Sequence, residues 1–340
     1  MKFLKIIPSG KAEWRNFALR WILLLLIIIP CLFYITKTPG ISYLGQLPPL
    51  TENENKLRRN IETHVVELAD KIGQRNIDFY FHLQKSETYI IDILKKIGYN
   101  VTTQEFKVRQ KIVKNIEVEL TGISLPKEIV LIGAHYDSVL GSKGANDNAS
   151  GVAALLELAR ILKDKNLSRT IRFVAFVNEE PPYFRTEHMG SVVYASHARM
   201  KGDNIVAMYS LETIGYYSNV SGSQEYPFPF SLFYPDTGNF IAFVGNLGSR
   251  DLLHKSLSIF RRKTSFPSEG VSAPSWMTGI GWSDQWSFWK EDYPGIMITD
   301  TALFRYKLYH TMSDTFDKLD YSKMSRIVSG IARMLEEIAD

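Results

Sequence analysis

The segment IVLIGAHYDSVLGSKGANDNASGVAALLELARILK, residues 129–163, decides the fold. It begins with an apolar run suited to a buried β-strand and continues through a loop of small and acidic residues. From about residue 150 onward, its apolar residues share one face at helical spacing. A strand, a loop and an amphipathic helix in this order are typical of a sheet covered by helices. We therefore expect the polar residues of the loop at the edge of that sheet.

The rest of the chain repeats this alternation. Further apolar runs of strand length occur at residues 171–177, 205–211, 240–244 and 296–299. Helical periodicity marks residues 56–71, 85–97 and 321–338. The pattern predicts an α/β fold with a mixed, largely parallel central sheet flanked by helices.

The composition bears on partners and on metal ligands. The 340 residues are 45% hydrophobic and 22% charged, which is ordinary for a globular chain. The formal net charge of +4 is small and the basic residues are spread along the chain, so we expect no nucleic-acid partner. The single cysteine, Cys31, cannot form an intramolecular disulfide, and any metal must be held by histidines and carboxylates.

The N-terminal region contains a charge-free apolar stretch at residues 21–36. Together with the residues just before it, this stretch can span a bilayer, which takes about 20 residues. Five basic residues precede it, whereas only Lys37 follows closely. The positive-inside rule therefore predicts a single-pass signal anchor at residues 18–36. Residues 1–17 would be cytoplasmic and the bulk of the chain extracytoplasmic, in the periplasm or outside the cell.

Two alternatives to an anchor stay open. A cleaved signal peptide would give a secreted protein, although residues 36–40 offer no clear small-x-small cleavage site. A buried core helix is disfavoured because the stretch has no polar face. After the span, residues 37–54 are rich in proline, glycine and polar residues, which predicts a linker before a folded domain at residues 55–340.

Polar residues follow the apolar runs at the place where open α/β sheets bind ligands, beyond the carboxyl ends of the strands. His135 and Asp137 follow the first run. Residues two apart in an extended chain point to the same side, so the carboxylate can orient the imidazole for a metal. Ordinary surface hydrogen bonds at a strand end are the alternative.

Two acidic motifs lie in similar places. Asp147 stands among small residues just before a helix, where its carboxylate could bridge two metals or the loop could simply cap the helix. Glu179 and Glu180 end the second apolar run, and Pro181 favours extended backbone at Glu180. One carboxylate could bind a metal while the other moves protons, although two acids in a row also suit a polar loop.

The same arrangement recurs after two more runs. Glu212 follows the third run, and Tyr309 with His310 lies in the loop after the last one. Four separate segments thus bring histidines and carboxylates to one edge of the predicted sheet. This grouping favours a metal site over a set of independent surface residues.

Five motifs together carry a resemblance to a known family. They are His135-Tyr-Asp-Ser, Gly144-Ala-Asn-Asp-Asn-Ala-Ser-Gly-Val, Phe176-Val-Asn-Glu-Glu, Leu211-Glu-Thr-Ile-Gly and Tyr309-His-Thr-Met-Ser-Asp-Thr. In this order they resemble the co-catalytic di-zinc aminopeptidases of the aminopeptidase Y and S kind, which are related to glutamate carboxypeptidase and secretory glutaminyl cyclase. The resemblance covers roughly residues 56–340. It implies the phosphorylase/hydrolase-like fold of zinc exopeptidases and two Zn²⁺ ions per chain.

The resemblance also implies which residues hold the two zinc ions. His135 and Glu212 would bind one ion, and Glu180 and His310 would bind the other. Asp147 would bridge them. Many members of the family carry Asp at the position of Glu212, so this residue departs from the family pattern.

Three further residues receive catalytic roles. By resemblance, Glu179 is the general base; Tyr309 would support the oxyanion, and Asp137 would orient the histidine two residues before it. Ser283-Asp284-Gln285 lies where relatives often have Ser-Asp-His, which suggests a hydrogen-bonding role near the site.

The function implied by the resemblance is hydrolysis of peptide bonds. The expected enzyme is a metallo-aminopeptidase that removes N-terminal residues from a peptide substrate by means of a water activated between two metals. A glutaminyl-peptide cyclase-like acyltransferase, which needs one zinc, and a non-catalytic receptor or scaffold ectodomain are the alternatives. The complete ligand set favours hydrolysis.

Four aromatic residues either line an apolar side-chain pocket or pack in the core, namely Trp282, Trp286, Trp289 and Phe304.

Overall fold

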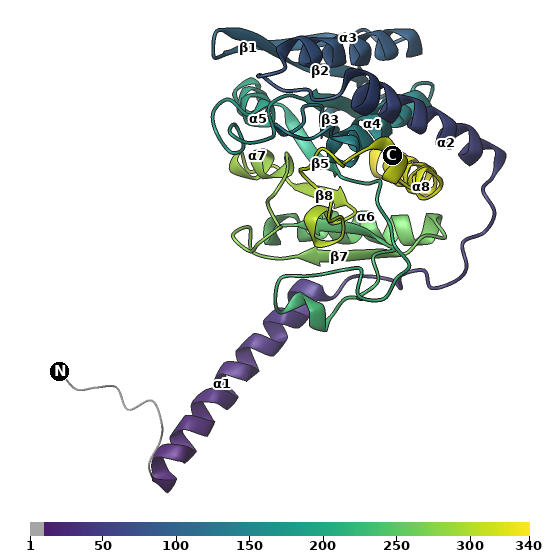
Figure 1. The fold of residues 1–340 in the computed structure, drawn as a ribbon. Helices are drawn as coiled ribbons and strands as arrows, with labels where there is room; N and C mark the ends of the chain where they lie inside the picture. The colour runs from purple at the N-terminus through teal and green to yellow at the C-terminus, as the bar shows by residue number, and fades with distance from the viewer. Residues whose placement is uncertain (1–9) are drawn as a thin grey trace. The chain divides into compact units, whose positions relative to one another are not determined.

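The computed structural model describes residues 10–340 and divides into two compact units, residues 1–37 and Thr38–Asp340 (Figure 1). Residues 1–9, which make up half of the predicted cytoplasmic segment, lie outside the described residues. The described part of the first unit is one helix, α1, Lys11–Thr36. Its 26 residues extend over about 39 Å at 1.5 Å per residue. The helix is long and apolar enough to cross a membrane, and its side chains are almost all exposed.

The second unit is built on an eight-stranded sheet with the strand order β1-β2-β4-β3-β5-β8-β6-β7. The pairs β3–β4, β3–β5, β5–β8 and β6–β7 are parallel, whereas β1–β2, β2–β4 and β6–β8 are antiparallel. The predicted mixed, largely parallel sheet is therefore confirmed. The strands are β1 Thr102–Val108, β2 Lys111–Leu120, β3 Leu125–His135, β4 Arg169–Phe176, β5 Asn204–Glu212, β6 Ile241–Gly245, β7 Ser268–Ser272 and β8 Gly295–Thr299.

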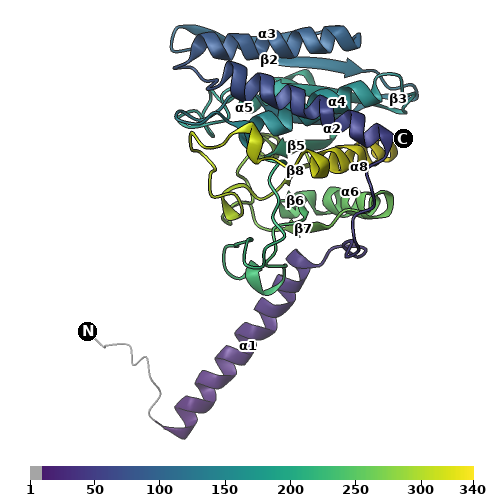
Figure 2. The same ribbon diagram turned by 45° about the vertical axis from the view of Figure 1, so that its right-hand side comes forward.

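Helices cover both faces of the sheet (Figures 1 and 2). The helices of this unit are α2 Glu52–Val65, α3 Tyr80–Ile97, α4 Gly151–Leu162, α5 Gly190–Lys201, α6 Arg250–Lys263, α7 Gln285–Lys290 and α8 Tyr321–Ala339. The larger hydrophobic core packs α2, α3, α4, α6 and α8 against the sheet. A smaller core on the other face packs α5 and α7 against β3, β4 and β5.

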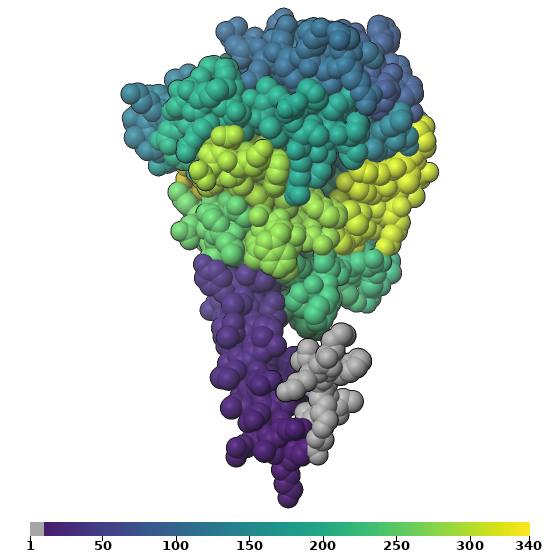
Figure 3. All heavy atoms as spheres, turned by 90° about the vertical axis from the view of Figure 1, so that its left-hand side faces the viewer, coloured from purple at the N-terminus to yellow at the C-terminus, as the bar shows by residue number. Residues whose placement is uncertain are grey.

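The face of the sheet that packs against α5 and α7 is covered by helices over only half of its width. The smaller core stops at β5, and the side chains of β6, β7 and β8 that point to this face line a pocket instead. Irregular segments between residues 224 and 234 and between residues 278 and 282 form the other walls of this pocket. In the space-filling view, the domain colours run from blue through teal to green, from the β1–β2 edge toward the β6–β7 edge (Figure 3).

The N-terminal segment of this unit lies along the edge strand β7. Residues 38–51 contain no helix or strand, and α2 begins at Glu52 after a capping box formed by Thr51 and Glu54. The Nη1 atom of Arg261 donates to Thr38 Oγ1 at 3.1 Å and to the Pro39 carbonyl at 2.8 Å. These hydrogen bonds hold the start of the predicted linker on the surface of the domain.

Candidate metal centre

Four neighbouring parallel strands bring the predicted site residues to one edge of the sheet. His135 is the last residue of β3, and Glu212 is the last residue of β5. Glu179 and Glu180 come shortly after β4, which ends at Phe176, and His310 lies in the loop after β8. The strands β4, β3, β5 and β8 are adjacent in this order and parallel to one another, so their carboxyl ends coincide. The ends of buried strands therefore set the positions of His135 and Glu212, and the loops that carry the other side chains begin at the same edge.

The five predicted ligands form two groups that share one carboxylate. His135 Nε2 lies 3.1 Å from Glu212 Oε2 and 3.2 Å from Asp147 Oδ1. His310 Nε2 lies 3.0 Å from the other oxygen of Asp147, Oδ2, and 3.2 Å from Glu180 Oε2. Within each group the potential ligand atoms all lie within 4.8 Å of one another. Asp147 thus presents one oxygen to each group.

His135 Nε2 and Glu212 Oε2 lie within hydrogen-bond distance of each other, but other ligand atoms of the two groups suit a cation better. Asp147 Oδ1 and His310 Nε2 are buried without a hydrogen-bond partner, although oxygen and nitrogen atoms lie close by. Buried polar atoms are rarely left in this state. Imidazole nitrogens and carboxylate oxygens are ligands that zinc accepts in proteins. The donor set can therefore hold two zinc ions, one in each group.

The charges of the ligand residues also favour bound cations. Asp147, Glu179, Glu180 and Glu212 are all buried. Burial raises the pKa of Glu180 to about 8, and the adjacent Asp147 carboxylate raises it as well. Burial also raises the pKa of Glu179 well above its usual range, with Glu212 and Glu180 acting in the same direction. These buried carboxylates lie beside two histidines, and divalent cations would supply the positive charge that they need.

Asp137 connects the ends of β3 and β4. Its Oδ1 accepts a hydrogen bond from the backbone N–H of Glu179 and its Oδ2 accepts one from Glu180, both at 3.1 Å. The same Oδ1 lies 3.5 Å from His135 Nδ1, on the side of the ring away from Glu212. Asp137 can therefore fix the orientation of the imidazole and of the two glutamates together.

The backbone is strained at one site residue and next to two others. Asn178, Thr213 and His310 have φ angles of 59°, 43° and 58°, in the left-handed region that residues with a side chain rarely adopt. Asn178 precedes Glu179, and Thr213 follows Glu212. Strained residues persist where the surrounding structure holds them, and they gather at functional sites.

The loop that carries Asp147 is held by residues from distant parts of the chain. Asp314 accepts hydrogen bonds from the backbone N–H groups of Asn146 at 2.8 Å and Asp147 at 3.1 Å. Asn148 Nδ2 donates to the Leu211 carbonyl at 2.8 Å. At Gly144, which has φ +62°, a Cβ atom would lie 2.4 Å from the Asp147 carbonyl oxygen, so the turn needs glycine.

A fully buried arginine, Arg75, also holds the loop that carries Asp147. Arg75 donates to the backbone carbonyls of Tyr136 at 2.9 Å, Lys143 at 2.7 Å and Gly144 at 2.8 Å. Two further bonds reach the carbonyls of Leu68 and Gly73. Sequence reasoning missed this residue, because no motif surrounds it and its partners are backbone atoms. Asp314 was quoted in the last motif but was given no role.

The serine that follows Trp282 supports Glu212. Ser283 Oγ donates to Glu212 Oε2 at 2.8 Å, which is the oxygen that faces His135. Both Ser283 and Asp284 are fully buried behind the site. Within Ser283-Asp284-Gln285, for which the sequence suggested a hydrogen-bonding role near the site, Ser283 thus makes a hydrogen bond to a proposed metal ligand.

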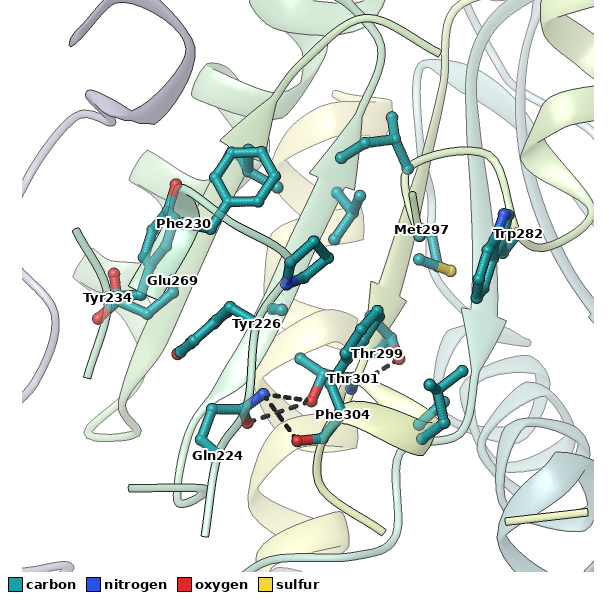
Figure 4. A pocket seen from close by; sticks show the side chains of 18 of the residues that line it. Gln224, Tyr226, Phe230, Tyr234, Glu269, Trp282, Met297, Thr299, Thr301 and Phe304 are labelled. Carbon is teal, nitrogen blue, oxygen red and sulfur yellow. Dashed lines mark hydrogen bonds between the residues drawn. The ribbon is translucent and has the colours of Figure 1, made fainter. Parts of the chain in front are cut away.

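A pocket opens beside the first group of ligands (Figure 4). It encloses about 820 Å³ of space, part of which is open solvent, and both Glu212 and Tyr309 lie in its wall. The ring of Tyr309 also stacks on the ring of His310, with 3.8 Å between their centres. Tyr309 therefore lies between the pocket and the second group of ligands.

The pocket wall is predominantly apolar and aromatic. Aromatic and apolar members of the wall are Tyr226, Phe230, Tyr234, Phe240, Val244, Val271, Ile280, Trp282, Met297, Leu303 and Phe304. Trp282 and Phe304 stack on each other across 6.4 Å, and Figure 4 shows both of them among the lining side chains. Of the four aromatic residues singled out in the sequence, these two line the pocket. The other two do not, and Trp289 donates from Nε1 to the Gly295 carbonyl at 2.8 Å instead.

Polar residues of the pocket wall are engaged with other residues. Gln224 Oε1 accepts from Arg305 Nε at 2.8 Å, and Arg305 Nη1 donates to the Phe240 carbonyl at 2.9 Å. Glu269 Oε2 lies 3.5 Å from Arg261 Nη2. The guanidinium of Arg261 offsets the charge of Glu269, an acidic residue of the wall.

Comparisons with known proteins add findings of two kinds. The sequence profile described as Peptidase family M28 matches residues 115–335. Uncharacterized protein YfbL of Escherichia coli (strain K12) is 35% identical over 324 residues, which cover 93% of this chain and 97% of that protein. Aminopeptidase YwaD of Bacillus subtilis (strain 168) is 35% identical over 133 residues, covering 37% of this chain and 28% of that protein.

The fold has a counterpart among solved structures. The zinc aminopeptidase BSAP from Bacillus subtilis aligns with a TM-score of 0.67 at 14% sequence identity. The alignment covers 83% of this chain and 95% of that chain. At this identity the likeness shows a common fold.

Proposed function

Since the chain belongs to peptidase family M28, we propose that it is a zinc-dependent aminopeptidase that removes N-terminal residues from peptides. The observation that carries the proposal is the position of Asp147, whose two carboxylate oxygens face two separate groups of ligands. The names of two similar proteins, an aminopeptidase and a zinc aminopeptidase, support the same activity.

We assign the five ligand residues to two zinc ions. His135 and Glu212 would hold one ion, Glu180 and His310 the other, and Asp147 would bridge the pair. Bound zinc supplies positive charge that polarises the scissile carbonyl and lowers the pKa of a water at the site. The residues around the ions then determine how the substrate is bound and how protons move.

Glu179 is assigned as the general base. Its carboxylate is buried, and Oε2 lies 4.0 Å from His135 Nε2, beside the first group of ligands. In hydrolysis, Glu179 accepts a proton from the attacking water as the oxygen–carbon bond forms. It then delivers that proton to the nitrogen of the leaving amine as the carbon–nitrogen bond breaks. The glutamate returns to its starting state after each turnover.

Two neighbouring residues assist this reaction. Asp137 is a positioning residue, because it accepts the backbone N–H of Glu179 and lies next to the ring of His135. Tyr309 lines the pocket beside Glu212, so its hydroxyl can donate to the oxygen that develops negative charge on the substrate carbonyl.

The pocket would take the side chain of the N-terminal residue of the substrate. It adjoins Glu212, and its floor is made by Ala242, Val271 and Met297 from three neighbouring strands. Apolar and aromatic walls favour large apolar side chains, since each buried CH₂ contributes about 0.8 kcal/mol. The proposed substrates are therefore peptides that begin with a large apolar or aromatic residue.

The helix α1 would anchor the enzyme in a membrane. Its length and composition are sufficient for one crossing. Three basic residues of the described helix, Lys11, Arg15 and Arg20, all precede its apolar part. By the positive-inside rule, the N-terminus would be cytoplasmic and the unit Thr38–Asp340 extracytoplasmic.

The activity can be tested with the full chain in detergent. We expect hydrolysis of phenylalanyl and leucyl p-nitroanilides, with lower rates for the alanyl compound and none for N-acetyl-leucyl p-nitroanilide. A chelator should abolish the activity, and added zinc should restore it. Release of pyroglutamyl peptide from a glutaminyl peptide, without hydrolysis of the other substrates, would identify a cyclase. Bound zinc without any turnover would support a scaffold role and contradict the proposal.

A further inference from the structure

The segment of residues 226–234, which we call the pocket loop, has two sides of different character. Its inner side chains, Tyr226, Phe230 and Tyr234, line the pocket (Figure 4). On its outer side, Phe228 is 83% exposed and Leu232 is 70% exposed. Single exposed apolar residues are common, but several large ones on one short segment indicate a contact surface.

The pocket loop is attached to the edge strand β7. Tyr234 Oη donates to the Gly270 carbonyl of this strand at 2.7 Å. Residues 38–42 are attached to the same strand, because the backbone N–H of Ser268 donates to Ser42 Oγ at 2.9 Å. A Cβ atom at Gly270 would lie 3.0 Å from Thr38 Cγ2. The pocket loop and the start of the domain thus meet at one strand.

More exposed apolar side chains lie on the segment that follows Thr38. Ile41 is 83% exposed and Leu44 is 90% exposed. They are close in the chain to Ser42, which is held on β7. The exposed apolar residues of the pocket loop and of this segment therefore belong to the same end of the domain.

The length of the chain places this end of the domain near the end of α1. The helix ends at Thr36, and Arg261 holds Thr38 on the domain, so only Lys37 lies between them. Two consecutive peptide units extend over about 7 Å at most. This limit holds for any orientation of the domain relative to the helix. If α1 crosses a membrane, Thr38 stays close to the surface of the bilayer.

We propose that the pocket loop contacts the lipid surface, with Phe228 and Leu232 entering the interfacial region of the bilayer. The proposal rests on the membrane anchor proposed above and goes beyond it, because it assigns a lipid contact to the folded domain. Large apolar side chains at the depth of the headgroups gain free energy by leaving water. Since the same segment forms a wall of the pocket, the pocket lies beside the membrane surface.

A fluorescence experiment on the full chain tests the contact. In a Cys31→Ser background, Leu232→Cys carries an environment-sensitive label, and the protein is placed in phosphatidylcholine nanodiscs. We expect a blue-shifted emission and at least twofold quenching when the lipids carry nitroxide groups on their acyl chains. Phe81→Cys is the matched control, since Phe81 is exposed on α3 and α3 packs on β2, far across the sheet from β7. Its label should show neither change.

The outcomes distinguish the lipid contact from a contact with a second copy of the chain and from the membrane anchor itself. Emission from Leu232→Cys that matches the control in both kinds of nanodisc would overturn the lipid contact. A blue shift that grows with protein concentration in detergent, without quenching by labelled lipids, would also overturn it and would indicate contact with a second copy of the chain. Labelling the native Cys31 in α1 tests the anchor separately, because its quenching by lipid reports insertion of the helix. None of these readouts depends on catalysis.

Discussion

The metal centre and the pocket beside it share Glu212 but are built in different ways. Each proposed ligand lies at the end of a strand or in a loop, and buried polar partners such as Asp137, Asp314 and Ser283 hold these ligands or their loops. The pocket takes its outer walls from irregular segments whose apolar side chains follow no regular spacing. The chemistry demands fixed residue types at fixed points, whereas a side-chain pocket demands only shape and apolarity.

The largest effect is expected from a substitution that leaves the metal ligands intact. Glu179→Gln keeps the shape of the side chain but removes the base, and it should lower kcat about 1,000-fold. Zinc content, measured by mass spectrometry, should stay at two ions per chain. Glu187→Gln is the control, because this exposed glutamate follows the same strand. Activity of Glu179→Gln within tenfold of the parent would remove Glu179 from the role of base.

Arg75, which holds the loop of Asp147, should contribute to the free energy of unfolding. Arg75→Met leaves several buried backbone carbonyls without their donors, and each such group costs about 1–3 kcal/mol. We expect a loss of about 3 kcal/mol, seen as a fall of several degrees in Tm when the full chain is heated with zinc present. Arg109→Met, at an exposed arginine, should leave Tm almost unchanged. Equal Tm values for the two variants would contradict the importance of Arg75.

The hold on Asp147 should control zinc affinity. Asp314→Asn loses one of its two bonds to the Asp147 loop, because an amide offers only one accepting oxygen. Zinc affinity, measured by competition with a chelating dye, should fall about 10- to 100-fold. Asp317→Asn, an exposed position in the same segment, provides the comparison. Unchanged zinc affinity in Asp314→Asn would show that the loop holds its shape without this carboxylate.

The smallest effect is expected in the pocket. Met297→Trp adds bulk to the pocket floor and should reduce kcat/KM for a phenylalanyl substrate about 10-fold more than for an alanyl one. Met200→Trp, at an exposed position on α5, should leave the ratio of the two kcat/KM values unchanged. A parallel fall for both substrates in Met297→Trp would indicate that the pocket does not hold the substrate side chain.

The same contrast explains how much could be predicted from the sequence. The strands β3, β4, β5, β6 and β8 were predicted because they are buried on both faces and consist of continuous apolar runs. The edge strand β7, with the sequence SEGVS, has no such run, and β1 is largely exposed. Pairing with a neighbouring strand, which no local pattern reports, makes these segments strands.

Some residues of the site could likewise be predicted from the sequence, and others could not. Four of the proposed ligands could be found because each is a histidine or an acid shortly after a predicted strand or before a predicted helix, whereas His310 was found through the motif that begins at Tyr309. Arg75 could not, since it acts through backbone carbonyls more than 60 positions away in the chain. Trp282 and Trp286 could not be told apart, because only their positions after chain folding decide that the first lines the pocket.

Asp147 is proposed to join two zinc ions, and anomalous diffraction at the zinc absorption edge tests this bridge most directly. Crystals of the full chain grown with zinc should show two peaks of anomalous density. One peak should lie between His135 and Glu212 and the other between Glu180 and His310, with Asp147 bound to both. A single peak, or two peaks that do not share Asp147, in a preparation that hydrolyses peptides would contradict the account.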